Sequence, residues 1–299
     1  MPRYRGRFAP SPTGPLHAGS LVAALASWLD ARAACGTWLV RMEDVDTGRI
    51  MPGADQRILA QLAAFGLTSD EPVVWQSTRF AAYEAALTQL CQSACAYPCT
   101  CSRRQILAKL EALGRLPERF HAPVYPGTCR PAPLTPQALF DKPGVAWRFA
   151  IPDGQPVVHW TDRRLGKQEQ DVEAEIGDFT VKRSDGLWAY QLAVVVDDAW
   201  QEITHVVRGE DLADNTARQI VLQQSLGAPT LSYLHTPLVL DERGDKLSKQ
   251  TGAPELPVDD LPGKLASAAQ ALGLSTEPGA VPDMLSRLVA QWQAIHPAA

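Results

Sequence analysis

The sequence lacks any apolar run that approaches the roughly 20 residues needed to cross a bilayer as a helix, and it lacks internal repeats and low-complexity segments. Its first five residues lead into glycine and proline where a secretion signal would carry an apolar core. We therefore expect a cytoplasmic protein. A basic excess is also lacking, because 28 Lys and Arg residues against 33 Asp and Glu residues give a net charge of −5. This balance argues against a protein that coats nucleic acid, although it allows a local cluster of basic residues.

The composition that is present suits a protein of two or more structural units. The 299 residues are 45% hydrophobic and 20% charged, which is enough to bury one large core and a smaller one. Six cysteines occur, and five of them lie between positions 91 and 129, with Cys35 standing apart. In a chain without a secretion signal, such clustering indicates metal binding more than disulfide formation.

The first part of the chain alternates strand and helix patterns. Residues 3–8 predict a strand, and the proline-rich segment 9–15 ends it. Apolar residues at helical spacing follow from Leu21. A second strand at 38–42 and a helix opened by residues 52–55 come next. This βαβα order predicts an α/β fold with a Rossmann-type parallel sheet wound by helices.

The pattern changes in the middle of the chain. A helix is predicted from Thr78 towards Ala94, after which residues 97–136 are proline-rich around one short helical stretch, as expected for an insertion. Regular structure resumes near residue 145. Later segments are predicted as regular structure at 145–151 and 187–196, a helix at 215–226, a strand at 237–240 entering a mobile loop, and two helices at 261–272 and 281–295.

These boundaries predict four regions. They are the first half of the Rossmann-type domain (1–96), an inserted metal-binding lobe (97–136), the second half of that domain with a lysine loop around Lys246 and Lys249 (137–256), and a short helical extension (257–299).

Two separate segments suit the binding of a nucleotide. His17, Gly19 and Ser20 precede a predicted helix, where an imidazole donor, close backbone approach and a positive dipole end all favour phosphate. Far along the chain, Lys246 and Lys249 flank Ser248 in a loop, where two lysines can close over a triphosphate as point charges. Read singly, the first segment also suits a helix cap and the second a solvated surface loop.

Together these segments resemble the two signature motifs of class I aminoacyl-tRNA synthetases, and most closely those of the glutamyl branch. The resemblance covers residues 7–250 and includes the stretch RFAPSPTG that begins at Arg7. It departs at Ser20, which replaces the second histidine of the signature, and at Gln250, which replaces a serine. The resemblance implies a Rossmann-type fold, ATP with Mg²⁺, and catalytic roles for His17, Ser20, Lys246 and Lys249.

The charges of three residues suggest which amino acid the site binds. Arg7, Glu43 and Arg208 supply cations for a carboxylate and an anion for an ammonium group at predicted strand ends, where open α/β sheets bind ligands. An ordinary ion pair, such as Glu43 with Arg41, is the alternative interpretation. The resemblance implies that glutamate contacts Arg7, Phe8, Ala9, Pro10, Ser11, Glu43, Tyr190 and Arg208, with Arg208 binding the side-chain carboxylate and Glu43 the amino group.

The cysteine cluster predicts one structural zinc ion. Cys99, Cys101 and Cys129 supply three thiolates, and zinc usually takes four ligands. On chemistry alone His121 is the better fourth ligand, whereas the resemblance implies Tyr125. Cysteines without metal are the alternative. Nearby arginines can contact phosphate, and they are Arg103, Arg104, Arg115 and Arg119.

Only 49 residues follow Gln250, too few for a large anticodon-reading region. The chain resembles shortened members of the glutamyl branch, which transfer glutamate to queuosine in the anticodon of tRNA(Asp). Two alternatives are a compact synthetase that charges the 3′ end of tRNA(Glu) and a zinc-containing binding protein without catalysis. No residue singles out the acceptor, and we expect a monomer.

Overall fold

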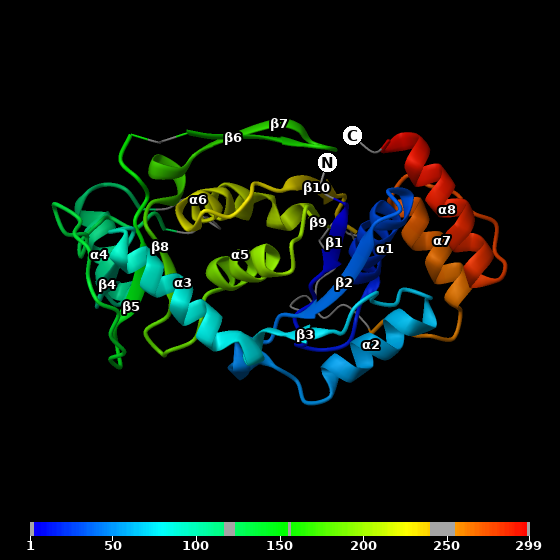
Figure 1. Cartoon of the computed structure of the whole chain (residues 1–299), viewed down its shortest axis with the longest axis horizontal. Helices are drawn as coiled ribbons and strands as arrows, with labels where there is room; N and C mark the ends of the chain where they lie inside the picture. The colour runs from blue at the N-terminus through cyan, green and yellow to red at the C-terminus, as the bar shows by residue number, and fades with distance from the viewer. Residues whose placement is uncertain (1–2, 117–122, 155–156, 240–254, 298–299) are drawn as a thin grey trace.

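The computed structural model describes residues 3–116, 123–154, 157–239 and 255–297. Within them the main sheet has the strand order β3-β2-β1-β9-β10-β6-β7 (Figure 1). All neighbouring strands pair in parallel except β6 and β7, which form an antiparallel hairpin. The strands are β1 (Arg5–Phe8), β2 (Thr37–Met42), β3 (Val74–Trp75), β6 (Val157–Asp162), β7 (Gly166–Asp171), β9 (His205–Gly209) and β10 (Ser232–Thr236). The predicted α/β fold with a mainly parallel sheet is confirmed.

Helices cover both faces of this sheet. On one face α1 (Ala18–Ala33) packs on β1 and β9, and α7 (Leu261–Ala271) and α8 (Val281–Ile295) pack on α1. On the other face α3 (Phe80–Gln92), α5 (Tyr190–Trp200) and α6 (Thr216–Leu226) contact one another (Figure 1). The order strand, helix, strand therefore produces a three-layered unit.

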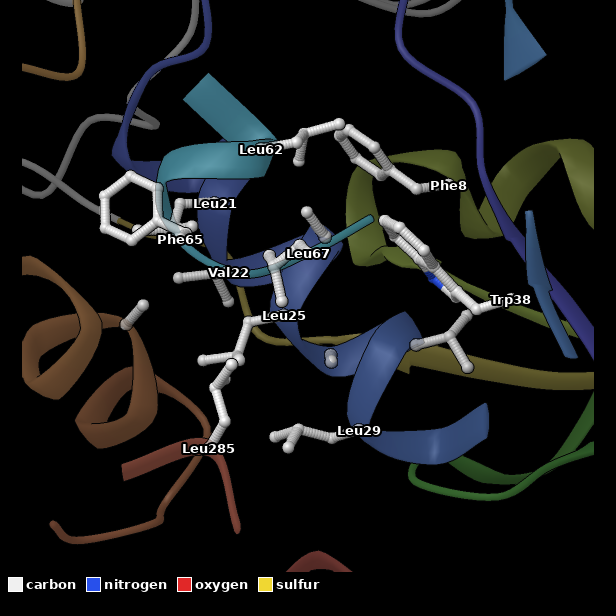
Figure 2. Close-up of a cluster of buried hydrophobic side chains, with 14 of the residues drawn as sticks. Phe8, Leu21, Val22, Leu25, Leu29, Trp38, Leu62, Phe65, Leu67 and Leu285 are labelled. Carbon is white, nitrogen blue, oxygen red and sulfur yellow. The ribbon is translucent and has the colours of Figure 1, made fainter. Parts of the chain in front are cut away.

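The alternation of side chains along the central strands explains why both faces of the main sheet are apolar. In β2, Trp38 and Val40 enter the cluster under α1, while Leu39 between them enters the cluster under α3 and α5. Successive side chains of a strand point to opposite faces, so a strand buried on both sides is apolar throughout. Figure 2 shows the first cluster, in which α1, α2 (Ala54–Ala64) and α8 meet around Leu25 and Leu285.

A smaller antiparallel sheet, in the order β4-β5-β8, lies beside the main unit. It consists of β4 (Ala96–Cys99), β5 (Ala146–Phe149) and β8 (Phe179–Lys182), and it carries the short helix α4 (Arg103–Ala112). Ser102 and Gln105 form a reciprocal capping box that starts α4. Because β5 and β8 follow the predicted insertion in sequence, the small sheet extends beyond residues 97–136, and the proposed division stays a prediction.

Most predicted elements are confirmed within a few residues, including the two C-terminal helices. The predicted strand at 237–240 is wrong for its described part, because β10 ends at Thr236. Pro237 lacks the N–H that would continue the ladder. The β6–β7 hairpin was not predicted from the sequence, because its outer strand is mostly polar. Among the described residues, no helix has the length and apolar character to span a membrane.

Candidate active site

A cavity of about 440 Å³ opens at the carboxyl ends of β1, β2, β9 and β10. Parallel strands share this edge, which is where open α/β sheets bind ligands. The beginnings of α1 and α5 close other sides of the cavity. The structure brings most of the sequence-predicted candidates to this one place, and those lining it are Arg7, Phe8, Ala9, Pro10, Ser11, His17, Gly19, Ser20, Glu43, Tyr190 and Arg208.

The start of α1 forms an anion-binding corner of the cavity. His17 has an extended backbone (φ −118°, ψ 174°), and helix α1 begins at the next residue. The first turn contains Gly19 and Ser20 and no acidic residue. The preceding loop is held in place by Gln61, whose side-chain oxygen accepts a hydrogen bond from the backbone N–H of Leu16 at 2.8 Å. The positive end of the helix dipole is therefore available to a phosphate.

Glu43 follows β2 and presents a carboxylate whose Oε1 atom is buried and accepts no hydrogen bond from the described residues. Nη2 of Arg41 lies 3.7 Å from it, but the same atom lies 2.7 Å from Asp198. Arg7 also donates to Asp198, with Nε at 3.0 Å and Nη2 at 3.2 Å. Both arginines are thus paired mainly with Asp198, and the predicted alternative of a Glu43–Arg41 ion pair is present only as the longer contact.

The pKa values of the two carboxylates in this network, Glu43 and Asp198, are shifted in opposite directions. Burial raises the pKa of Glu43 to about 7, and the negative charge of Asp198 adds to the rise while Arg41 and Arg7 oppose it. Burial also opposes ionisation of Asp198, but Arg7 and Arg41 lower its pKa below the usual range. A cation that binds beside this network therefore stabilises the ionised form of Glu43 more than that of Asp198, which already has two cationic partners.

Arg208 in β9 is held by neutral acceptors. Its Nε lies 3.1 Å from Nε2 of His235, Nη1 lies 2.7 Å from Oε1 of Gln219, and Nη2 lies 2.9 Å from Oγ1 of Thr216. The hydroxyl of Tyr190 is 3.5 Å from Nη1. Within the described parts of the chain no carboxylate forms an ion pair with this guanidinium. Its positive charge is buried beside the cavity without a counter-charge from these described parts, which favours an anionic ligand.

The lysine loop lies outside the described residues. The approach of Lys246, Ser248 and Lys249 to the cavity therefore stays a prediction. The described chain on either side of them does lie at the site, because Val239 lines the cavity and the backbone of Leu256 bonds to that of Leu16, just before the start of α1.

Three thiols meet at the edge of the small sheet. The Sγ atoms of Cys99, Cys101 and Cys129 all lie within 4.8 Å of one another. The hydroxyl oxygen of Tyr125 lies 3.4 Å from Sγ of Cys99 and 3.5 Å from Sγ of Cys101. Four donor atoms therefore converge, which fits a tetrahedral ion with bonds of about 2.3 Å to sulfur.

The surroundings favour metal binding by this cluster. Although burial opposes it, hydrogen bonds from Tyr125 and from the backbone of Thr100 lower the pKa of Cys129 to about 7, towards the thiolate that binds metals. The alternative ligand His121 lies outside the described residues. Cys91 is buried near the end of α3, where burial raises the pKa of its thiol to about 12, which does not favour metal binding there.

Comparisons with known proteins agree with this geometry. Residues 3–262 match the family of tRNA synthetases class I (E and Q), catalytic domain. The glutamyl-Q tRNA(Asp) synthetase of Leptothrix cholodnii is 60% identical over 97% of this chain and 96% of its own length. That of Albidiferax ferrireducens is 54% identical over 98% of this chain and 99% of its own length. This chain belongs to the glutamyl-Q tRNA(Asp) synthetases.

A solved structure places the glutamyl-Q tRNA(Asp) synthetase fold among longer relatives. The crystal structure of glutamate-tRNA synthetase from Elizabethkingia anophelis is similar with a TM-score of 0.70 and 30% identity, over 84% of this chain and 53% of that one. This chain thus spans about half the length of that protein. Glutamyl-Q tRNA(Asp) synthetases are ligases of the aminoacyl-tRNA synthetase type, which depend on ATP.

Several residues of the site were missed by sequence reasoning. Asp198, Arg41 and His235 organise the charged side chains around the cavity, yet none was assigned a role. Asp198 offered one signal, since it stands beside another acid in an otherwise apolar helix. The partners of His235 come from distant strands, and no local pattern indicates them.

Proposed function

We propose that this chain activates glutamate with ATP and transfers it to queuosine in the anticodon of tRNA(Asp). The observation that carries the first step is the pair of opposite charges in one cavity. Among the described residues, one carboxylate oxygen of Glu43 accepts no hydrogen bond, and the partners of Arg208 are all neutral. A free amino acid with an acidic side chain offers the matching ammonium and carboxylate groups. The names of the similar proteins from Leptothrix cholodnii and Albidiferax ferrireducens support glutamate and tRNA(Asp).

In this proposal Arg208 and the Tyr190 hydroxyl bind the side-chain carboxylate of glutamate, and Glu43 binds its α-ammonium group. The segment from Arg7 to Ser11 forms the floor beneath the α-carboxylate. Arg7 is already bonded to Asp198, so it adds positive charge and shape to the site while its geometry stays fixed.

ATP occupies the corner at the start of α1. His17, Gly19 and Ser20 contact its phosphates there, with Mg²⁺ accompanying the nucleotide, and Lys246, Ser248 and Lys249 approach from the lysine loop. An oxygen of the α-carboxylate attacks the α-phosphorus, the bond to the bridging oxygen breaks, and pyrophosphate leaves. The lysines neutralise the negative charge that grows on the phosphates, so positioning and electrostatics supply most of the rate enhancement.

In the second step a hydroxyl of queuosine attacks the carbonyl carbon of glutamyl-adenylate, and AMP leaves with its negative charge. The product is a glutamyl ester on the modified base. Because the acceptor is tRNA, we place the reaction in the cytoplasm, and we expect the enzyme to act as a monomer.

We propose further that Cys99, Cys101, Tyr125 and Cys129 hold one zinc ion. The convergence of the four donor atoms supports this assignment. A site with four protein ligands has no open position, so zinc stabilises the lobe of residues 97–136 without entering the reaction. The exposed arginines of α4, Arg103 and Arg104, then face tRNA phosphates.

Exchange of radiolabelled pyrophosphate into ATP tests the activation step. We expect glutamate to support exchange without any tRNA, and glutamine and aspartate to support little. Glutamine lacks the second carboxylate, and in aspartate it is one carbon closer to the ammonium group, so neither satisfies Glu43 and Arg208 together. Exchange that is absent with glutamate, or equal with glutamine, would refute the proposed recognition.

A further inference from the structure

Arg208 is supported by two buried residues that do not line the cavity. His235 in β10 is fully buried, and Asp162 at the end of β6 is 1% exposed. Nε of Arg208 lies 3.1 Å from Nε2 of His235, and Nδ1 of His235 lies 2.7 Å from Oδ2 of Asp162. The three side chains form a continuous chain across β9, β10 and β6, which are neighbours in the sheet.

Hydrogen-bonding chemistry determines where the proton of His235 lies. A guanidinium only donates, so Nε2 of His235 accepts from Arg208 and carries no proton. The proton of the neutral ring is then on Nδ1, from which it is donated to Asp162. His235 is therefore a neutral acceptor in one tautomer, and the carboxylate selects that tautomer.

Both oxygens of Asp162 are needed as acceptors. While Oδ2 accepts from His235, Oδ1 accepts from the backbone N–H groups of Arg164 at 3.0 Å and Leu165 at 2.9 Å. An amide at this position would therefore place an NH₂ group against one set of donors. With its oxygen towards the two backbone groups, its NH₂ would face Nδ1 of His235 and force the ring proton onto Nε2, against Nε–H of Arg208.

The turn that carries Asp162 is anchored on both sides. Arg163 donates to Asp30 of α1 at 2.9 Å. Arg164 donates to the backbone carbonyl of His235 and to Glu210. The β6–β7 hairpin is thereby fastened to the strand and helices around the cavity, so that Asp162 is held in one position.

We infer that Asp162 and His235 are positioning residues for glutamate recognition: they fix the guanidinium of Arg208 through a neutral acceptor and leave its positive charge for the substrate carboxylate. A carboxylate in direct contact with Arg208 would hold the guanidinium equally well but would neutralise it. The His235 ring keeps the negative charge of Asp162 away from Arg208. Asp162 fixes the orientation of the ring, and the ring in turn fixes the orientation of the guanidinium. The identity of the ligand rests on the proposed function, whereas the tautomer of His235 does not.

The tautomer is measured directly by ¹⁵N NMR of the imidazole ring, with the His235 signal assigned from its loss in His235→Gln. We expect a proton on Nδ1 in the wild type and on Nε2 in Asp162→Asn. In pyrophosphate exchange, Asp162→Asn should raise KM for glutamate by about tenfold to a hundredfold, because a buried donor is turned against a donor. KM for ATP and the unfolding temperature should change little by comparison.

Two further variants serve as controls. Asp171→Asn changes a carboxylate at the other end of the same hairpin, which accepts from the backbone N–H of Ala174, and should keep the wild-type KM. His235→Gln retains an acceptor carbonyl for Arg208 and has no tautomer, so adding Asp162→Asn to it should raise KM for glutamate far less than in the wild-type background.

The outcomes separate this inference from the proposed function. A wild-type ring with its proton on Nε2, or an equal rise of KM for glutamate and ATP in Asp162→Asn, would overturn the inference. If Asp162→Asn does not fold, the wild-type tautomer still decides it, because a proton on Nε2 contradicts the inference and a proton on Nδ1 supports it. Wild-type enzyme without glutamate-dependent exchange would instead refute the proposed function, and the NMR result would stand on its own.

Discussion

Arg41 lies 3.7 Å from Glu43, yet its close contact, at 2.7 Å, is with Asp198. Glu43 consequently keeps a buried oxygen that accepts no hydrogen bond from the described residues. Burial raises its pKa to about 7. A carboxylate in this state is costly to keep charged and binds an ammonium group strongly when one arrives.

The pH dependence of glutamate activation follows from this carboxylate. Protonated Glu43 no longer attracts an ammonium group, so kcat/KM for glutamate should fall as the pH drops through about 7 and approach a slope of about tenfold per pH unit below it. KM for ATP should stay nearly flat. Pyrophosphate exchange across this range provides the measurement, and a kcat/KM for glutamate that is constant through neutral pH would contradict the role of Glu43.

The same pKa predicts an effect on stability. The folded-state pKa of Glu43, about 7, lies above the reference value of 4.5, so its contribution to stability is fully present below the unfolded pKa and is lost as the pH rises through about 7. The loss is on the order of 3 kcal/mol. Glu43→Gln does not ionise, so its unfolding temperature relative to wild type should increase between acidic and mildly alkaline pH, as measured without glutamate. A difference that stays constant with pH would show that Glu43 ionises normally.

Arg208→Gln should separate glutamate from ATP. We expect KM for glutamate to rise about a hundredfold, since a buried carboxylate loses its charged partner, while ATP binding measured by titration changes little. Arg218→Gln is a matched control in α6, because the Arg218 guanidinium donates to the backbone carbonyl of Asp214. Equal losses for glutamate and ATP in Arg208→Gln would point to misfolding.

Lys249→Ala tests the lysine loop. Removing a charge that stabilises the transition state should lower the rate of adenylate formation by about a hundredfold or more. The proper comparison is Lys264→Ala, which removes a lysine paired with Asp259 in the C-terminal region and should leave the rate unchanged. An unaltered exchange rate in Lys249→Ala would remove the assignment.

Metal content tests the cysteine cluster. Wild type should contain about one zinc per chain, and Cys129→Ser should lose most of it together with thermal stability, because metal binding contributes to folding. Cys35→Ser, at an exposed free cysteine, should retain the zinc. His121→Ala should also retain it if Tyr125 is the fourth ligand. Equal zinc in wild type and Cys129→Ser, measured by elemental mass spectrometry, would refute the site.

The sequence was most informative where function needs residue types close together in the chain. The thiols Cys99 and Cys101 are two positions apart, and His17 and Ser20 are three positions apart at the start of α1, so local patterns indicated both places. The end of the second strand was also predictable, because Glu43 follows the largely apolar run from Trp38 to Met42. The parallel sheet then brings such ends to one edge.

The supporting residues were not predictable in this way. Asp162 meets His235 across 73 positions, and Arg41 meets Asp198 across 157. Such contacts depend on the order of strands in the sheet, which local hydrophobic patterns do not specify. The hairpin that carries Asp162 was missed for a related reason, since the polar β7 at the sheet edge has few apolar residues to mark it.

The transfer of labelled glutamate tests the central claim most directly. The enzyme, ATP and radiolabelled glutamate are incubated separately with tRNA(Asp) containing queuosine, the same tRNA(Asp) with guanosine in its place, and tRNA(Glu). We predict that label is found only on tRNA(Asp) containing queuosine, and that nuclease digestion places it on the anticodon base. Label on the terminal adenosine of tRNA(Glu), or labelling of tRNA(Asp) without queuosine, would contradict the account.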